Sequence, residues 1–293
     1  MKVLVYGAGV CGSLFSARLY EAGHDVSLLA RGERLAALRR HGVQLAEADS
    51  PAVRRVAVPV VEHSAGGYDL IAVVVRAHQV DAVLESLAGV EGDVLFLLNW
   101  AAGAEPLGAV IGHERVLLGF PAAAGVMDGD VVRYRATSLM TRRVPMPIGE
   151  PSGRNTPRLE RIVRTFRTAG INAKAEPRMD AWLRTHAAFA VPLGQAVIAA
   201  GGPRALAEDP DAVRGMIRLM RQNLAAMPTP AVPRGFVALQ ALPESLLAAM
   251  LRRFLRSPTA AHSGLDNASP ATEAAELERV AEQMRTYARV GRR

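Results

Sequence analysis

A glycine-rich segment near the start of the chain has the residue types and spacing that bind phosphate. Gly7-Ala8-Gly9-Val10-Cys11-Gly12 matches the pattern G-x-G-x-x-G, follows an apolar run and opens an amphipathic helix. In such a loop Gly7 permits a tight turn, Gly9 lets a pyrophosphate approach the backbone, and Gly12 lets the helix pack closely on the strand. Unpaired N–H groups at the positive end of the helix then hold the pyrophosphate. The alternative is a glycine-rich turn without a ligand.

An arginine occupies the position that distinguishes the two nicotinamide dinucleotides. Arg31 follows Gly12 by nineteen residues, at the end of the second predicted strand. A site for NAD carries Asp or Glu there, because a carboxylate accepts a hydrogen bond from the free ribose 2′-hydroxyl. A guanidinium instead pairs with a 2′-phosphate, so the sequence predicts NADPH. Glu33 is a counter-signal, Arg34 is a candidate second cation, and a merely exposed Arg31 is the alternative.

The elements that must position these residues alternate between strands and helices. Strands are predicted at 2–6, 26–29, 70–75, 94–98 and 116–120, and helices at 11–22, 34–41 and 79–87. This order is typical of right-handed βαβ units, so we expect an α/β fold with a Rossmann-type doubly wound sheet. Further strands are expected within 131–148 and at 171–175, with a helix at 157–169 between them.

Beyond Pro177 every periodic segment is helical, which places a domain boundary there. We expect an NADP(H)-binding domain at 1–176 and an all-helical domain for substrate binding and dimerisation at 177–293. The last helix is predicted to begin with Ser269 as its N-cap and Pro270 in its first turn. Its inward stripe is expected to include Ala274, Leu277, Val280, Ala281, Met284 and Ala288.

The composition excludes several classes of protein and site. Hydrophobic residues make up 50% of the 293 residues and charged residues 22%, so the chain can bury a core. Cys11 is the single cysteine, which excludes a disulfide framework and a cysteine-based zinc site, and we expect no metal. The uncharged stretch 185–203 is interrupted by Pro192 and Gly194, so it predicts a buried helix and no membrane span. We expect a cytoplasmic protein.

The net charge of +7 is carried almost entirely by arginine. Of the 35 basic residues only Lys2 and Lys174 are lysine, and no basic run contains interleaved aromatic residues. We therefore expect no nucleic-acid partner. The charge is explained either by a solvated surface or by a positive field that attracts small anions. Because arginine cannot deliver a proton, a lysine-dependent acid step has two candidates.

Several segments together resemble the ketopantoate reductase (2-dehydropantoate 2-reductase) family. These are Gly7–Gly12, Leu28-Leu29-Ala30-Arg31, Val73-Val74-Val75-Arg76-Ala77-His78-Gln79, Leu97-Leu98-Asn99-Trp100-Ala101-Ala102-Gly103, Ile148-Gly149-Glu150 and Trp182-Leu183-Arg184. The resemblance implies a Rossmann domain followed by an all-helical domain similar to that of 6-phosphogluconate dehydrogenase. It also implies NADPH and an anionic 2-keto acid in the cleft between the domains.

The resemblance assigns roles to four residues. Arg76 matches a lysine that the family places near the cofactor after the third strand, and Asn99 matches an asparagine after the fourth. The amide of Asn99 would contact the nicotinamide ribose or a substrate carbonyl. Thr272-Glu273 resembles a pair in which the glutamate contacts the substrate hydroxyl. The alternatives are polar residues that cap strand ends, and a glutamate that stabilises a helix end or pairs with an arginine.

The helical part departs from the family pattern. The family has W-x-K and asparagines four and eight residues later, whereas this chain has Arg184, Ala188 and Pro192. An arginine can hold a substrate carboxylate but cannot act as the acid, and the two amides are lost. The sequence therefore predicts a substrate other than ketopantoate. For the proton we considered His186, which is expected to face the core, and also His78, His262 and water.

These observations predict an NADPH-dependent reductase that transfers a hydride to a small carbonyl compound carrying an acid group. Arg184, Asn99 and Glu273 are the predicted catalytic residues, and Gly7–Gly12, Arg31, Arg76 and Asn99 are the predicted cofactor-binding residues. The alternatives are a catalytically silent NADPH-binding sensor or partner-binding protein, and a reductase of an imine or another keto compound. The sequence leaves a homodimer open.

Overall fold

The computed structural model describes residues 1–48, 50–123, 125–135, 145–257, 260 and 270–290. The chain divides into two compact units. Unit 1 comprises Met1–Leu98 and Gly103–Met179, and unit 2 comprises Asn99–Ala102 and Asp180–Arg293. The main division lies three residues beyond the expected boundary at 176/177, because Met179 is buried and lies against Gly149 of unit 1.

Unit 1 contains an eight-stranded sheet in the order β12-β11-β8-β7-β6-β1-β2-β5. The strands are β1 (Lys2–Tyr6), β2 (Asp25–Leu29), β5 (Val60–Val61), β6 (Leu70–Val73), β7 (Asp93–Leu97), β8 (Val116–Gly119), β11 (Met146–Gly149) and β12 (Ala173–Ala175). All neighbouring pairs are parallel except β8 with β11. The predicted doubly wound α/β fold is confirmed.

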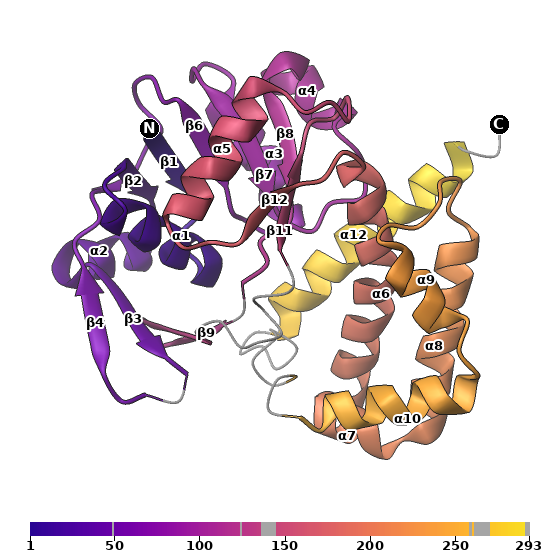
Figure 1. Ribbon diagram of the computed structural model, residues 1–293. Coiled ribbons are helices and arrows are strands. Elements are labelled where there is room, and N and C mark those ends of the chain that lie inside the picture. Colours follow the sequence, from indigo (N-terminus) through magenta and orange to yellow (C-terminus); the bar gives the residue numbers. More distant parts are fainter. Residues whose placement is uncertain (49, 124, 136–144, 258–259, 261–269, 291–293) are drawn as a thin grey trace. The chain divides into compact units, whose positions relative to one another are not determined.

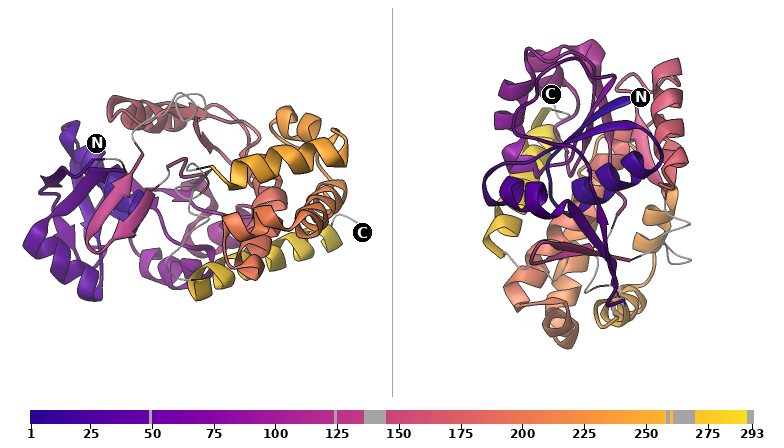
Figure 2. Two further views of the ribbon diagram at one scale, coloured as in Figure 1. Left: turned by 90° about the horizontal axis from the view of Figure 1, so that it is seen from below. Right: turned by 90° about the vertical axis from the view of Figure 1, so that its left-hand side faces the viewer.

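Helices cover both faces of this sheet (Figures 1 and 2). They are α1 (Val10–Glu21), α2 (Gly32–His41), α3 (Val80–Leu87), α4 (Glu105–Ile111) and α5 (Pro157–Thr168), with short 3₁₀ turns η1 (Ala77–Gln79) and η2 (His113–Arg115). In the figures α1 and α5 lie on one face, and α3 and α4 lie on the other. Every residue of β6 is buried, as expected for an apolar strand covered on both sides.

A second, four-stranded sheet in unit 1 was not predicted from the sequence. Its order is β4-β3-β10-β9, formed by β3 (Val43–Glu47), β4 (Val53–Val56), β9 (Gly125–Asp128) and β10 (Val131–Tyr134). The sequence of β4, Val-Arg-Arg-Val, has no alternation of apolar and polar residues, and its first three residues are exposed. The strands expected within 131–148 are β10 and β11, and residues 136–144 lie outside the described residues.

An ion pair between the buried Glu150 and the half-buried Arg158 connects the end of β11 with α5. Arg158 donates to both carboxylate oxygens of Glu150, at 2.7 Å from Nε and 2.5 Å from Nη2, and its Nη1 donates to Asp93 at 2.9 Å. Its remaining N–H groups donate to the carbonyls of Glu114 and Val116. Burial raises the pKa of Glu150, but hydrogen bonds from Arg158 and Thr156 outweigh it and hold this pKa below its ordinary value.

Unit 2 is helical in its described part beyond Met179. It contains α6 (Met179–Ala200), α7 (Pro203–Glu208), α8 (Pro210–Ala225), α9 (Arg234–Gln240), α10 (Glu244–Leu255) and α12 (Pro270–Val290). Its core includes Val213, Met216, Ile217, Met220 and Leu247. The structure therefore confirms the expected helical second part (Figure 1).

The buried face of α12 differs from the expected apolar stripe. Leu277 and Val280 are buried as expected, but Ala274 is exposed. Two polar residues, Glu276 and Gln283, are buried instead, at 3% and 7% exposure. The expected N-cap Ser269 lies outside the described residues.

Two absences concern the described residues alone. No helix in them is long and apolar enough to cross a membrane. They also contain no group of three or more His, Cys, Asp or Glu residues placed to hold a metal ion.

Candidate functional site

The glycine-rich loop of unit 1 connects β1 with α1 and depends on three glycines for different reasons. Gly7 has φ +113°, and a Cβ there would lie 2.3 Å from the carbonyl oxygen of Val74. A Cβ on Gly12 would lie 1.8 Å from the carbonyl oxygen of Gly7, so the helix approaches the strand too closely for a side chain. Gly9 is exposed, with no atom within 4 Å of its Cβ position. The open space at Gly9, beside the first turn of α1, fits a phosphate group.

The loop lies at the point where the strand order of the sheet reverses. The chain runs from β1 to β2 on one side, whereas β6 pairs with the opposite edge of β1. The N–H of Val74, just beyond β6, donates to the carbonyl oxygen of Tyr6 at 2.8 Å, so the ends of β1 and β6 are adjacent. Ligands of open α/β sheets bind at such a point, beyond the carboxyl ends of the strands.

Three arginines follow the carboxyl ends of these strands. Arg31, after β2, is exposed, and its Nη2 donates to the hydroxyl of Tyr6 at 2.6 Å. Arg34 is half-buried and donates to the carbonyl oxygen of Ala8 and the hydroxyl of Ser13, both at 3.2 Å. Arg76 is half-buried after β6, and its N–H donates to the side chain of Gln79 at 3.1 Å. Arg34 thus stabilises the glycine-rich loop and the first turn of α1 through hydrogen bonds, whereas the side chain of Arg31 is exposed at the surface.

Two titratable groups beside the loop have shifted pKa values. Burial raises the pKa of the Cys11 thiol to about 11, although the charge of Arg76 lowers it, so the thiol is protonated at neutral pH. Its Sγ lies 3.9 Å from the carbonyl oxygen of Ala123. Burial and the charge of Arg76 both lower the pKa of His78. Cys11 therefore fills space in the loop and has no thiolate character.

A buried polar cluster in unit 2 surrounds the predicted site residue Asn99. The Nδ2 of Asn99 donates to Oε1 of Glu276, in α12, at 3.2 Å. Because a carboxylate oxygen accepts and does not donate, this contact fixes the direction of the amide. The Oδ1 of Asn99 is buried and has no hydrogen-bond partner among the described residues. The cluster therefore presents an acceptor that a hydroxyl or N–H of a ligand would satisfy.

The segment that carries Asn99 is held by both α6 and α12. The N–H of Ala101 donates to Oε1 of Gln283 at 2.9 Å, and its carbonyl accepts from Nε of Arg184 at 3.1 Å. The Nη1 of Arg184 donates to Asp180, and the guanidinium lies 3.5 Å from the ring centroid of Tyr287. Arg184 is buried, with 7% of its side chain exposed, and its Nη2 has no hydrogen-bond partner among the described residues.

Glu273 is the site residue predicted on α12, whereas Glu276, Gln283 and Tyr287 are not among the predicted site residues. Glu273 is half-buried and has interaction partners, whereas Glu276 is the buried carboxylate that reaches Asn99. Glu276 and Gln283 are seven residues apart, which places them on one face of the helix. That spacing is the signal that could have identified them.

The remaining residues of α6 show how this site departs from the family pattern. Ala188 and Pro192, which stand where the family has asparagines, are both buried and offer no side-chain hydrogen bond. His186 stacks on Trp182, with ring centroids 5.4 Å apart, and burial lowers its pKa to about 4. His186 is thus neutral at pH 7. His262 lies outside the described residues.

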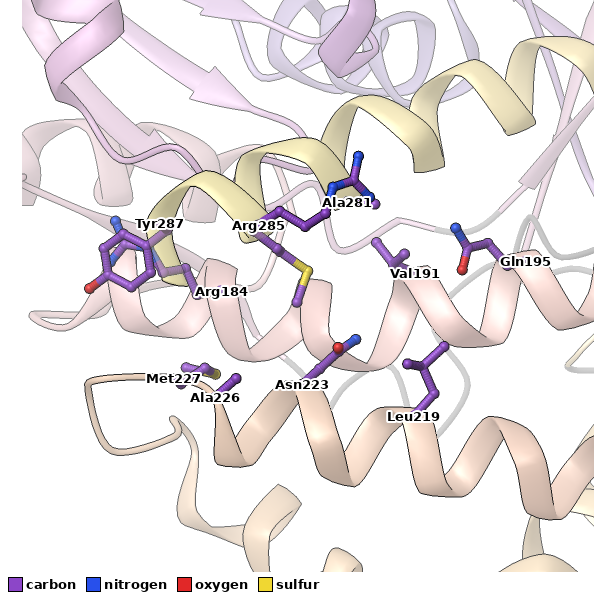
Figure 3. A pocket seen from close by; sticks show the side chains of 11 residues that line it. Arg184, Val191, Gln195, Leu219, Asn223, Ala226, Met227, Ala281, Arg285 and Tyr287 are labelled. Atoms are coloured by element: carbon purple, nitrogen blue, oxygen red, sulfur yellow. The ribbon is translucent and has the colours of Figure 1, made fainter. Parts of the chain in front are cut away.

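A cavity of about 360 Å³ lies in unit 2 between α6, α8 and α12 (Figure 3). Its lining consists of Arg184, Val191, Gln195, Leu219, Asn223, Ala226, Met227, Ala281, Met284, Arg285 and Tyr287. We refer to this cavity as the trough. Figure 3 shows Arg184 and Tyr287 at one end of the trough, Gln195 at the other end, and Asn223 between them. Among the described residues, the lining contains two arginines, two amides, a tyrosine and apolar side chains, and no carboxylate.

Comparisons with known proteins agree with the fold and with the loop. The family model "Ketopantoate reductase PanE/ApbA" matches residues 3–140. A 2-dehydropantoate 2-reductase of Mesorhizobium japonicum is 25% identical over 213 residues, which span 63% of this chain and 63% of that relative. The matched region is thus less than two thirds of the relative's length.

Solved structures of the same architecture cover nearly the whole chain. A 2-dehydropantoate 2-reductase from Geobacter metallireducens superposes with a TM-score of 0.69 at 18% identity, covering 99% of this chain and 100% of that one. D-mandelate dehydrogenase with NADH and anilino(oxo)acetate gives a TM-score of 0.68 at 16% identity, covering 98% and 99%. At these identities the structures show a shared fold. The family model over residues 3–140 and the curated relatives support membership of the chain in the ketopantoate reductase family, and the solved structures show the shared fold.

Proposed function

We propose that the protein is an NADPH-dependent reductase of a small 2-oxo acid other than ketopantoate. The observation that carries the proposal is the glycine loop at the reversal point of the sheet, with Arg31 following the neighbouring strand. When bound, the nicotinamide dinucleotide supplies the hydride. Unit 1 would hold it through Gly7–Gly12, Arg31 and Arg76.

The preference for NADPH rests on the charge at the end of β2. Arg31 is exposed and is held by the hydroxyl of Tyr6, so its guanidinium is available to a 2′-phosphate. The solved structure of D-mandelate dehydrogenase with NADH shows that this fold also accommodates the dephosphorylated cofactor. The choice between the two therefore depends on local residues, and here the local residue is a cation.

The residues of unit 2 would act on the substrate. Nη2 of Arg184 would bind its carboxylate, and Oδ1 of Asn99 would accept a hydrogen bond from a hydroxyl of the product or of the cofactor ribose. Glu273 would orient the hydroxyl side, as the family resemblance implies. Ketopantoate is a poor candidate, because Ala188 and Pro192 remove the amides that the family supplies to it.

A catalytically silent NADPH-binding protein is the second candidate, and one observation favours it. Arginine replaces the family's proton-donating lysine at position 184, and the chain's two lysines, Lys2 and Lys174, both belong to unit 1. Binding without turnover would support this candidate.

Two matched variants in unit 1 test the cofactor assignment by fluorescence titration with NADPH and NADH. Arg31→Ala should weaken NADPH about tenfold, roughly 1.4 kcal/mol, and leave NADH nearly unchanged, because NADH has no 2′-phosphate. Gly9→Ala adds a methyl group where the structure has open space, so the variant should fold yet weaken both cofactors about equally.

The unmodified protein provides the decisive comparison. We expect it to bind NADPH at least about tenfold more tightly than NADH. Equal affinity for the two cofactors would refute the assignment of Arg31. A Gly9→Ala variant that binds both as tightly as the unmodified protein would refute the loop as the pyrophosphate site.

A further inference from the structure

A tyrosine at the carboxyl end of β1 contacts the arginine that follows β2. Tyr6 is the last residue of β1, directly before the glycine-rich loop, and its exposure is 4%. Its hydroxyl accepts a hydrogen bond from Nη2 of Arg31 at 2.6 Å, and the guanidinium lies 5.7 Å from the centroid of its ring. A buried side chain of one strand therefore holds the exposed cation that follows the neighbouring strand.

The hydroxyl of Tyr6 belongs to a chain of hydrogen bonds whose direction follows from its two ends. The hydroxyl oxygen lies 3.0 Å from Oγ of Ser86, in α3, and this Oγ lies 2.8 Å from the carbonyl oxygen of Val83. A guanidinium can only donate and a carbonyl can only accept. The hydroxyl hydrogen of Ser86 therefore goes to Val83, and that of Tyr6 goes to Ser86. All three donors then point one way, from the exposed guanidinium to a backbone carbonyl of α3.

The partner of Arg31 differs from the partners of two arginines in α2. Arg34 donates to the carboxylate of Asp130 at 3.3 Å. Arg39 lies 4.0 Å from the carboxylate of Glu62. A carboxylate offsets the charge of its partner, whereas the hydroxyl that holds Arg31 is neutral. Arg31 is thus fixed in place while its full charge and its other N–H groups remain for an anion.

An arginine that is already held costs less to bind than a free one. An exposed arginine loses rotamer freedom when it binds a phosphate, and ordering such a side chain costs about threefold to tenfold in affinity. The bond from Arg31 to Tyr6 restricts the side chain before any ligand arrives. The hydroxyl should therefore strengthen the binding of a ribose 2′-phosphate and leave the binding of a free 2′-hydroxyl unaffected.

We propose that Tyr6 is a positioning residue that increases the preference for NADPH by holding Arg31. Ser86 contributes less, because it accepts from the phenol and does not contact the guanidinium. This inference rests on the proposed function, which takes Arg31 as the partner of the 2′-phosphate. It adds a second determinant of the cofactor preference, one that carries no charge.

Fluorescence titration with NADPH and NADH tests the proposal without turnover. Tyr6→Phe removes only the hydroxyl oxygen, so the variant should fold, weaken NADPH about threefold to tenfold and leave NADH within about twofold. Unchanged affinity for NADPH, or an equal loss for both cofactors, would overturn the proposal. Thermal unfolding of each variant confirms that it is folded.

Tyr68→Phe is the matched control. Tyr68 is also buried, and the ammonium of Lys2 lies 5.2 Å from its ring centroid. It precedes β6, which runs parallel to β1, so it lies at the edge of the sheet opposite to the glycine-rich loop. Loss of its hydroxyl should change neither affinity. A loss of NADPH affinity as large as that in Tyr6→Phe would remove the special role of the Tyr6 hydroxyl.

Combining Tyr6→Phe with Arg31→Ala separates positioning from a general effect on the strand. Without the guanidinium the hydroxyl has no cation to hold, so Arg31→Ala and the double variant should bind NADPH equally. A further loss of threefold or more in the double variant would show that Tyr6 does not act through Arg31. Ser86→Ala should weaken NADPH by less than Tyr6→Phe does, and a larger loss would contradict the order of the chain.

The outcomes keep this inference apart from the proposed function. A preference for NADPH that Tyr6→Phe leaves unchanged refutes the role of Tyr6 while the assignment of Arg31 stands. Equal affinity of the unmodified protein for both cofactors refutes the assignment of Arg31 and the role of Tyr6 together. A preference that Tyr6→Phe reduces, without reduction of any 2-oxo acid, supports the role of Tyr6 and refutes the reductase.

Discussion

Two arginines, one in each unit, are bonded in different ways: the side chain of Arg158 is 23% exposed and that of Arg184 is 7% exposed. Arg158 in unit 1 uses all of its N–H groups, on the carboxylates of Glu150 and Asp93 and on two backbone carbonyls. Arg184 in unit 2 donates to Ala101 and Asp180, and its Nη2 has no hydrogen-bond partner among the described residues. Every N–H group of Arg158 thus has a hydrogen-bond partner, whereas Nη2 of Arg184 has none among the described residues. Arg184 also lines the trough.

The difference separates an arginine that stabilises the fold from one that is available to a ligand. A guanidinium with every N–H donor satisfied has no donor left for a ligand. Removing it leaves its buried carboxylate partner without a cation, which is destabilising. A guanidinium with an unused nitrogen still has N–H donors for a carboxylate ligand. The number of hydrogen bonds that an arginine makes therefore indicates better than its burial whether it is available to a ligand.

The largest expected effect is on stability, at Arg158. Arg158→Met should lower the free energy of unfolding by about 3–5 kcal/mol, because Glu150 is left buried at 4% exposure without its cation. Arg184→Met should cost less, about 1–3 kcal/mol, since Asp180 is 40% exposed and can be rehydrated. Urea denaturation measures both. A larger loss at Arg184 than at Arg158 would break the comparison.

The exposed neighbour Arg161 provides the control. It lies 4.0 Å from Asp93 with 59% of its side chain exposed, so Arg161→Met should change stability by less than about 1 kcal/mol.

The pair in unit 1 also predicts a pH dependence. The pKa of Glu150 is lower in the folded protein than its ordinary value of 4.5, so the folded state binds this proton less readily than the unfolded state. The resulting stabilisation is fully present above pH 4.5 and is lost as the pH falls through the lower, folded pKa. Urea denaturation from pH 7 to pH 3 should show stability falling below about pH 5, with a shallower fall in Arg158→Met. Parallel pH curves for the two proteins would contradict the pairing.

A smaller effect is expected where the amide of Asn99 meets Glu276. In Glu276→Gln the new side-chain amide can donate to Oδ1 of Asn99, which occupies the buried acceptor that has no hydrogen-bond partner among the described residues. We expect the affinity for a 2-hydroxy acid to fall several-fold, about 1 kcal/mol for one hydrogen bond. Glu278→Gln, an exposed position on the same helix, should leave it unchanged. Indistinguishable binding by the two variants would exclude a role for the Asn99 acceptor.

Much of unit 1 could be predicted because its signals are local. An apolar strand followed by glycines at fixed spacing specifies both the turn and the helix, and the limits predicted for β1 match the structure. The second sheet could not be predicted, because β3 and β10 are far apart in the sequence and β4 has no alternating pattern.

In unit 2 the hydrogen-bond partners of the buried polar side chains could not be predicted from the sequence. Glu273 and Glu276 are one helical turn apart, and the choice between them depends on which carboxylate reaches Asn99, a residue 177 positions away. Likewise, the two hydrogen bonds and the ring contact of Arg184 come from three different segments. Helical periodicity assigns a face to each residue, but the contact itself is a tertiary property.

The most direct test of the account is steady-state oxidation of NADPH with a panel of 2-oxo acids that includes ketopantoate. The account predicts that an acid with an apolar side chain is reduced with a kcat/KM of about 10⁴ M⁻¹ s⁻¹ or above, which is ordinary for a native substrate. It predicts that ketopantoate is reduced far less efficiently, because Ala188 and Pro192 provide no amide to contact it. A kcat/KM of about 10⁴ M⁻¹ s⁻¹ or more for ketopantoate, or no oxidation of NADPH with any acid of the panel, would contradict it.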